Sequence, residues 1–129
     1  MKIAIIGMGV AGVSVLSAMT KHPIFQKHEI ILFDKPQTFG TGLPYQPDSS
    51  IILLNQTADT MSMEQNDRLD FVRWVEKHKG YHHCEKEHLP RPWYGEYVRE
   101  KLEKAIAILK PEVREEYVTD ISLQKDGTF

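Results

Sequence analysis

Three glycines near the N-terminus constrain the fold of this 129-residue chain more than any other feature. They follow the apolar run of residues 3–6 directly and precede a stretch compatible with a helix. In this spacing Gly7 permits a sharp turn out of a strand, Gly9 lets the backbone approach a pyrophosphate, and Gly12 lets the helix pack closely on the strand. The free N–H groups and positive dipole end of the helix then face the phosphates. The predicted pyrophosphate loop consists of Gly7, Met8, Gly9, Val10, Ala11 and Gly12.

An acidic residue follows at the distance that this motif requires. The second apolar run, residues 30–33, ends at Asp34, which lies 22 positions after Gly12. An acid about 20 residues beyond the glycines accepts hydrogen bonds from the ribose hydroxyls of a dinucleotide. The glycines alone would also fit a tight turn without a ligand, but strand, helix, second strand and acid together favour a dinucleotide site.

The hydrophobic pattern predicts an α/β fold. Residues 2–6 and 29–34 are expected to form parallel strands, joined by a crossover helix over residues 10–21. A second helix is expected from Asn66 or Asp67 to about His78, and a third from about residue 93 to residue 110. The intervening residues 35–65 have no long period, which predicts a long, functional loop with a short strand at residues 51–54.

Each predicted helix has a face that is expected to be buried. In the first helix this face carries Val10, Val13, Ser14, Ser17 and Ala18. In the second helix it carries Leu69, Phe71, Val72, Trp74 and Val75. In the third helix it carries Val98, Leu102, Ala105, Ile106 and Leu109.

The C-terminal residues predict an unfinished sheet. Residues 116–123 alternate in the pattern of a strand. Asp126 and Gly127 form a strong hairpin signal, but only two residues remain for the returning strand. We therefore expect residues 1–129 to be the N-terminal part of one domain, truncated at a C-terminal β-hairpin, and a fragment of a longer protein.

Charge and composition exclude several classes of partner. The formal net charge is −2, the pI is about 6.3 and the basic residues are scattered, so no nucleic-acid or anionic-membrane surface is expected. The apolar run of residues 3–19 is short for a membrane span of about 20 residues and has no clear signal-peptide cleavage site. The single cysteine, Cys84, cannot form an internal disulfide, and with no secretion signal this favours the reducing cytoplasm.

Several motifs beyond the glycine turn resemble those of one protein family. They occur in the same order over nearly the whole chain, and their combination is far more specific than the glycines alone. They are Gly7-x-Gly9-x-x-Gly12, Phe33-Asp34, Phe39-Gly40-Thr41-Gly42-Leu43-Pro44-Tyr45, Leu53-Leu54-Asn55, Met61-Ser62, Phe71-x-x-Trp74 and Pro90-Arg91-x-x-Tyr94-Gly95-Glu96-Tyr97. The chain resembles the N-terminal part of the bacterial FAD-NAD(P)-binding family, flavoprotein-like proteins distantly similar to the N-hydroxylating flavin monooxygenases.

The resemblance implies a Rossmann-like FAD-binding domain of the glutathione-reductase type, with a parallel sheet flanked by helices. In such a domain the glycine loop would hold the pyrophosphate, Asp34 would bind the adenosine ribose, and the backbone near Val118 would meet the adenine edge. Many flavoproteins of this type have glutamate where Asp34 stands, so the aspartate leaves NAD open as the cofactor. NADP is disfavoured because the carboxylate repels a 2′-phosphate, although the neighbouring Lys35 reduces that repulsion.

Three further residues are candidates for cofactor contacts. Gly42, like Gly40, permits a positive φ or a close backbone approach, so its loop could fold over the cofactor, although an ordinary turn fits equally well. Asn55 offers an amide to a flavin or a ribose, or is a turn residue. The guanidinium of Arg91 suits phosphate or carboxylate, or forms an ion pair with a nearby glutamate.

The cluster of His82, His83, Cys84 and His88 does not predict a metal centre. Adjacent histidines rarely hold one ion in a tight site, and no matching ligand pair appears elsewhere in the sequence. A solvated loop is the expectation. Cys84 lacks an assignable orienting group, so a role as nucleophile is not predicted.

Two classes of function fit these observations. The first is the FAD-binding portion of a flavin-dependent oxidoreductase that uses NAD(P)H, in which the flavin carries the redox chemistry. No residue of the chain is a credible acid, base or nucleophile with a partner, so this portion alone is expected to be inactive. The second is a non-enzymatic module that binds NAD or FAD as a sensor or interaction partner, since this fold hosts both classes.

Overall fold

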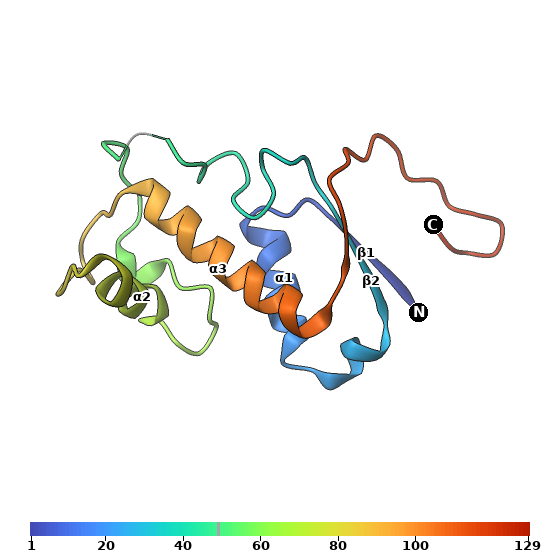
Figure 1. Cartoon of the computed structure of the whole chain (residues 1–129), viewed down its shortest axis with the longest axis horizontal. Coiled ribbons are helices and arrows are strands. Elements are labelled where there is room, and N and C mark those ends of the chain that lie inside the picture. The colour runs from blue at the N-terminus through green and yellow to red at the C-terminus, as the bar shows by residue number, and fades with distance from the viewer. Residues whose placement is uncertain (49) are drawn as a thin grey trace.

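The computed structural model describes residues 1–48 and 50–129, and its core element is a three-stranded parallel sheet (Figure 1). The strands β1 (Lys2–Ile6), β2 (Glu29–Phe33) and β3 (Glu112–Arg114) lie in the order β1-β2-β3. β1 pairs with β2 over its full length, whereas β3 pairs only with the second half of β2. The predicted parallel strands at residues 2–6 and 29–34 are confirmed.

Three α-helices accompany the sheet: α1 (Val10–Thr20), α2 (Asp70–Lys79) and α3 (Arg91–Leu109). Two 3-10 helices, η1 (Pro23–Lys27) and η2 (Ala58–Thr60), lie in the connections. α1 packs along α3 beside the sheet, and α2 lies at the far end of α3 (Figure 1). The chain is therefore an α/β, Rossmann-like domain, as predicted.

One face of the sheet is built into the hydrophobic core. Ile30 and Leu32 of β2 are buried there, and Ile3 and Ile5 of β1 pack against the same core. On the opposite face Ile6 is 49% exposed. The alternation of side chains along each strand thus directs one set toward α1 and α3.

The helix faces agree largely with the periodicity. Phe71, Val72, Trp74 and Val75 of α2 are buried, and so are Val98, Leu102, Ala105 and Leu109 of α3. α1 differs from the prediction, because it buries Gly12, Val13, Leu16 and Met19, whereas Ala18 is exposed. The larger Leu16 and Met19 belong to the buried face of α1. The prediction that its small residues mark that face is therefore wrong.

Helix boundaries differ by a few residues from the expected ones. α2 begins at Asp70 and not at residue 66 or 67, which leaves Leu69 outside the helix and 41% exposed. α3 begins at Arg91, earlier than expected, because Pro92 is well suited to the first helical turn. The loop prediction for residues 35–65 is confirmed for the described residues, with an isolated bridge from Leu53 to Pro90 in place of a strand; Ser49 lies outside them.

The strand predicted at residues 116–123 is wrong. The third strand is β3, which follows α3 after a left-handed Lys110, and residues 115–123 have no regular structure. A turn does form at Gly127, where Gln124 accepts from the amide of Gly127 and donates to Thr128, but no hairpin strands flank it. The position of β3 is set by which residues pair with β2. An alternating hydrophobic pattern does not encode that pairing.

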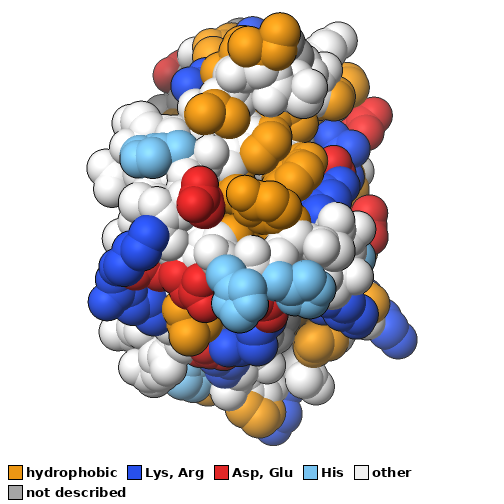
Figure 2. Space-filling model, turned by 90° about the vertical axis from the view of Figure 1, so that its left-hand side faces the viewer, with side chains coloured by type: hydrophobic (Ala, Val, Ile, Leu, Met, Phe, Trp, Pro, Cys, Tyr) orange, Lys and Arg blue, Asp and Glu red, His pale blue; other side chains and the backbone are white. Residues whose placement is uncertain are grey.

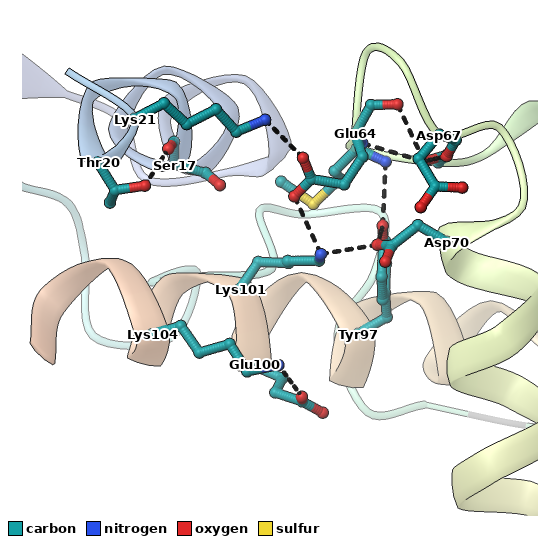
Figure 3. Close-up of polar contacts among 12 residues, drawn as sticks. Ser17, Thr20, Lys21, Glu64, Asp67, Asp70, Tyr97, Glu100, Lys101 and Lys104 are labelled. Atoms are coloured by element: carbon teal, nitrogen blue, oxygen red, sulfur yellow. Dashed lines mark hydrogen bonds and ion pairs between the residues drawn. The ribbon is translucent and has the colours of Figure 1, made fainter. Parts of the chain in front are cut away.

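A partly exposed ionic network joins the three helices (Figure 3). Nζ of Lys101 on α3 lies 2.7 Å from Oδ2 of Asp70 and 3.1 Å from Oε1 of Glu64. Glu64 also pairs with Lys21 after α1 at 2.6 Å. The hydroxyl of Tyr97 donates to Asp70 at 2.6 Å and accepts from the amide of Met63. The network therefore fixes α1, α2 and α3 relative to one another.

In the part of the chain that the structure describes, no helix is both long and apolar enough to cross a membrane.

Candidate dinucleotide-binding site

The glycine turn has the geometry that the sequence predicts. Gly7 has a φ of +89°, a conformation that side chains other than glycine rarely adopt, and its N–H donates to the carbonyl oxygen of Phe33 at 2.8 Å. A Cβ on Gly12 would lie 2.0 Å from the carbonyl oxygen of Gly7. The turn therefore requires glycine at both positions, one for its backbone angle and the other for the contact of helix with strand.

The N-terminus of α1 presents free backbone donors. The first hydrogen bond of the helix runs from the N–H of Val13 to the carbonyl oxygen of Gly9 at 3.0 Å, so the amides of Val10, Ala11 and Gly12 precede the helical ladder. No side chain among the described residues caps this end. These amides and the positive end of the helix dipole fit a pyrophosphate, whose oxygens accept hydrogen bonds and carry negative charge.

Asp34 lies at the end of β2, beside the glycine turn, and its carboxylate organises the surrounding backbone. Oδ2 accepts the N–H of Met8 at 2.7 Å, while Oδ1 accepts the N–H of Lys35 at 2.7 Å and the hydroxyl of Thr38 at 2.8 Å. A carboxylate offers about four lone-pair positions, so one on Oδ2 remains for a further donor such as a ribose hydroxyl.

The loop after β2 lies over the glycine turn. The N–H of Gly40 donates to the carbonyl oxygen of Met8 at 2.7 Å. Gly42 has a φ of +63°, and its Cα lies 3.4 Å from the position that a Cβ on Gly9 would take. Gly40 has a φ of +85°, so the positive φ that the sequence allowed at Gly40 and Gly42 is observed, and the loop comes within ordinary contact distance of Gly9.

A surface groove of about 360 Å³ lies beside Asp34. Its lining residues are Asp34, Lys35, Thr38, Gly42, Leu43 and Tyr117. Nζ of Lys35 lies 4.1 Å from the ring centroid of Tyr117. Val118, the residue expected at the adenine edge, follows Tyr117 in the chain, so the structure brings the neighbourhood of Val118 to that of Asp34 although it forms no strand.

Asn55 and Arg91 lie on two segments that pair with each other. The N–H of Leu54 donates to the carbonyl oxygen of Leu89, and the N–H of Arg91 donates to that of Ile52, both at 2.8 Å. Among the described residues, neither segment makes a hydrogen bond with the glycine turn, and Arg91 forms no ion pair with a glutamate. Contact of Asn55 and Arg91 with the cofactor therefore stays a prediction.

The face around α2 is apolar in one part and charged in another (Figure 2). Hydrophobic side chains gather in the middle and upper part of this face with charged side chains on either side of them, and more charged side chains and histidines lie below. Ile52 and Leu53, next to Asn55, are 38% and 49% exposed. Any ligand that reached Asn55 would therefore meet apolar side chains on the same segment.

The cluster after α2 differs in one respect from the expected solvated loop. His82, His83 and His88 are exposed, but Cys84 is fully buried. Burial raises the pKa of the Cys84 thiol, which favours its neutral, unreactive form. No group of three or more histidine, cysteine or acidic side chains among the described residues is arranged to hold a metal ion.

Two polar residues of this region have no motif of their own in the sequence. Thr38 bonds to the carboxylate of Asp34, and Tyr117 lines the groove. For Thr38 the available signal was its position four residues after Asp34, within the loop that carries Gly40 and Gly42. For Tyr117 the signal was its place directly before Val118.

Comparison with known proteins agrees with this geometry. No curated protein matches the chain. The model of the FAD-NAD(P)-binding family matches residues 4–129, which include the glycine turn, Asp34 and the groove. The chain therefore belongs to the FAD-NAD(P)-binding family, and its domain is a dinucleotide-binding domain.

Proposed function

We propose that this chain is the FAD-binding N-terminal part of a flavin-dependent oxidoreductase that takes its reducing equivalents from NAD(P)H. The observation that carries the proposal is the position of Asp34, which lies at the end of β2, bonds to the amide of Met8 and keeps a lone pair for a ribose hydroxyl. The family supports FAD or NAD(P) at such a site, and the resemblance described above assigns FAD to this turn.

In this proposal the chain binds and orients the cofactor. The amides of Val10, Ala11 and Gly12 donate to the pyrophosphate, and no lysine is needed in the turn because the helix end supplies the positive charge. The carboxylate of Asp34 accepts from the adenosine ribose and repels a 2′-phosphate, which favours FAD or NAD over NADP. The bound flavin would supply the hydride chemistry itself.

The groove residues give no sign of a catalytic acid or base. The titratable side chains of the groove are those of Asp34, Lys35 and Tyr117. The carboxylate of Asp34 is held by three donors, and Lys35 and Tyr117 contact each other. We therefore place the substrate step on segments outside this chain and expect the chain alone to have no oxidoreductase activity.

A second candidate is a non-enzymatic module that binds NAD. The aspartate at position 34 leaves this candidate open, because this shorter acid serves the ribose of NAD as readily as that of FAD. The two candidates predict the same pyrophosphate and ribose contacts. They differ in whether the protein retains a flavin.

The test is an absorbance spectrum of the purified protein, before and after addition of FAD, followed by acid release and identification of any bound nucleotide. A two-band flavin spectrum with released FAD is the expected result. Asp48→Asn, which changes an exposed acid in the loop after β2, is a matched control for Asp34→Asn in the same assay. A protein that stays colourless with FAD but binds NAD in a calorimetric titration would overturn the flavin proposal and support the NAD-binding module.

A further inference from the structure

An aromatic ring and an aliphatic side chain are exposed on the groove beside Asp34. Tyr117 is 68% exposed and Leu43 is 80% exposed, and both line the groove. Large apolar side chains in such positions are common singly, but here two of them meet at one concave site that also holds a carboxylate. The groove therefore combines apolar surface with polar side chains, among them the carboxylate of Asp34, and such a lining suits a nucleoside.

The ring of Tyr117 already carries a cation. Nζ of Lys35 lies 4.1 Å from the ring centroid, within the range of a cation–π contact. Lys35 is exposed, and no carboxylate within ion-pair distance of its ammonium is found in the described part of the chain. The contact with Tyr117 is thus a weak one between two surface side chains, and a ligand that stacks on the ring can displace it.

We propose that Tyr117 is the base-stacking residue of the site, and that the ammonium of Lys35 occupies its ring until a purine base displaces it. The proposal deepens the proposed function and rests on it, because the base belongs to the adenosine half that FAD and NAD share. Asp34 anchors the ribose, and the groove leads from Asp34 to Tyr117, so a nucleoside whose ribose lies at Asp34 directs its base toward the ring.

Stacking on Tyr117 would bind the base, whereas the ribose and the pyrophosphate have no flat aromatic face to stack. A purine presents a flat aromatic face to Tyr117, and a base stacked on an aromatic side chain is bound without reading its hydrogen-bonding edge. The backbone near Val118 is left to contact that edge. Tyr117 therefore contributes affinity for the base, while Asp34 and the amides of α1 contribute affinity for the ribose and the pyrophosphate.

The experiment titrates the full chain with adenosine and follows backbone amide chemical shifts by NMR. Adenosine carries no phosphate, so the charge of Lys35 does not attract it through the ligand's anionic groups. The variants are Tyr117→Ala, Tyr117→Phe and Lys35→Gln. Tyr81→Ala is the matched control, because Tyr81 is 45% exposed and contacts Trp93, which does not line the groove.

We expect Tyr117→Ala to raise the dissociation constant for adenosine at least about fivefold, as loss of an aromatic stacking partner does. Tyr117→Phe and Tyr81→Ala are expected to leave it unchanged. Lys35→Gln is expected to lower it about two- to fivefold, because the base no longer competes with an exposed cation–π contact.

Equal affinity of the wild-type chain and Tyr117→Ala for adenosine overturns the stacking proposal. Weaker binding by Lys35→Gln overturns the displacement of the cation. A parallel titration with FAD separates these failures from failure of the proposed function. If FAD binds equally well to the wild-type chain and Tyr117→Ala, only the role of Tyr117 is lost. If adenosine binds as expected but FAD does not, the flavin proposal alone is lost, and if neither binds, both are overturned.

Discussion

The backbone N–H of Met8 donates to Oδ2 of Asp34 at 2.7 Å, and this bond joins the glycine turn to the end of β2. The carboxylate also accepts from the amide of Lys35 and the hydroxyl of Thr38. Asp34 thus ties the glycine turn to the loop after β2, in addition to lining the groove. Its replacement has a structural consequence as well as a consequence for binding.

Replacement of Asp34 by alanine is expected to lower the free energy of unfolding by about 1–3 kcal/mol, because Met8, Lys35 and Thr38 lose their common acceptor. Asp34→Asn keeps one acceptor oxygen and is expected to lose less stability, but to bind FAD about tenfold more weakly because the charge-assisted bond to the ribose is lost. Urea unfolding and FAD titration measure the two effects. An Asp34→Ala protein as stable as the Asp48→Asn control would show that the carboxylate has no structural role.

Gly9 and Gly12 are expected to respond differently to alanine. A Cβ on Gly12 would lie 2.0 Å from the carbonyl oxygen of Gly7, so helix and strand must separate and the free energy of unfolding falls by about 1–3 kcal/mol. A Cβ on Gly9 would lie 3.4 Å from Cα of Gly42, an ordinary contact, so the free energy of unfolding stays within about 0.5 kcal/mol of the wild-type value.

Binding separates the same two variants. Gly9→Ala is expected to weaken FAD binding although the chain stays folded, because the added methyl group stands where the backbone approaches the pyrophosphate. Circular dichroism during thermal unfolding and FAD titration test the pair. Equal loss of stability in both variants would contradict the assignment of Gly12 to helix packing and of Gly9 to phosphate approach.

Local patterns predicted the parts of the fold whose causes are local. The turn at Gly7 depends on one backbone angle, and the buried face of α3 depends on a 3.6-residue period; both were predicted. The third strand was misplaced because an alternating pattern at residues 116–123 suits a strand anywhere, whereas Glu112–Arg114 are the residues that reach β2 after Lys110. Register between strands distant in sequence is set by such tertiary constraints.

In the site, as in the fold, features set by local sequence spacing were predicted, and contacts between separate segments were not. Asp34 was found by its spacing from Gly12, because the length of the crossover helix fixes that spacing. The bonds from Met8 and Thr38 to Asp34, and the contact of Gly9 with Gly42, join segments whose separation in space no periodicity encodes. Asn55 and Arg91 were proposed from the chemistry of their amide and guanidinium groups, and their role as cofactor contacts stays a prediction.

The hydroxyl of Tyr97 is expected to contribute more to stability than that of Tyr94. Tyr97 is fully buried, donates to Asp70 and accepts from the amide of Met63, and burial, with the bond to Asp70, raises the pKa of its phenol so that it stays neutral. Tyr97→Phe leaves the amide of Met63 and the carboxylate of Asp70 without this partner, which costs about 1–3 kcal/mol.

Tyr94→Phe is the matched control for this change. Tyr94 is 5% exposed and packs on the same aromatic cluster, but its hydroxyl makes no hydrogen bond with the described residues. Its loss is expected to change the free energy of unfolding by less than about 0.5 kcal/mol. Urea unfolding curves of both variants test the difference. Equal curves would show that the hydrogen bonds of the Tyr97 hydroxyl do not stabilise the fold.

Asp59 is expected to make stability depend on pH in a defined acidic range. Its side chain accepts from Nζ of Lys86 at 2.6 Å and from the hydroxyl of Thr57 at 2.7 Å, and it pairs with Arg68. The bond from Lys86, then that from Thr57, lowers the pKa of Asp59 from an ordinary value of 3.8 to about 2. The charged form is therefore favoured by the folded state more than by the unfolded state.

Because the folded-state pKa is the lower one, the contribution of Asp59 to stability is fully present above about pH 4 and is lost as the pH falls toward about 2. Asp59→Asn cannot titrate, so its stability is expected to fall less steeply than that of the wild-type chain over this range. Glu64, Asp70 and Glu100 also have lowered pKa values and add a slope of the same sign to both proteins, which the difference between the two curves removes. Urea midpoints measured from pH 6 to pH 2 give both curves. Parallel curves would mean that the folded chain stabilises the charged form of Asp59 no more than the unfolded chain does. Convergence of the two curves as the pH falls would identify the contacts of Asp59 with Lys86 and Thr57 as a source of the acid sensitivity.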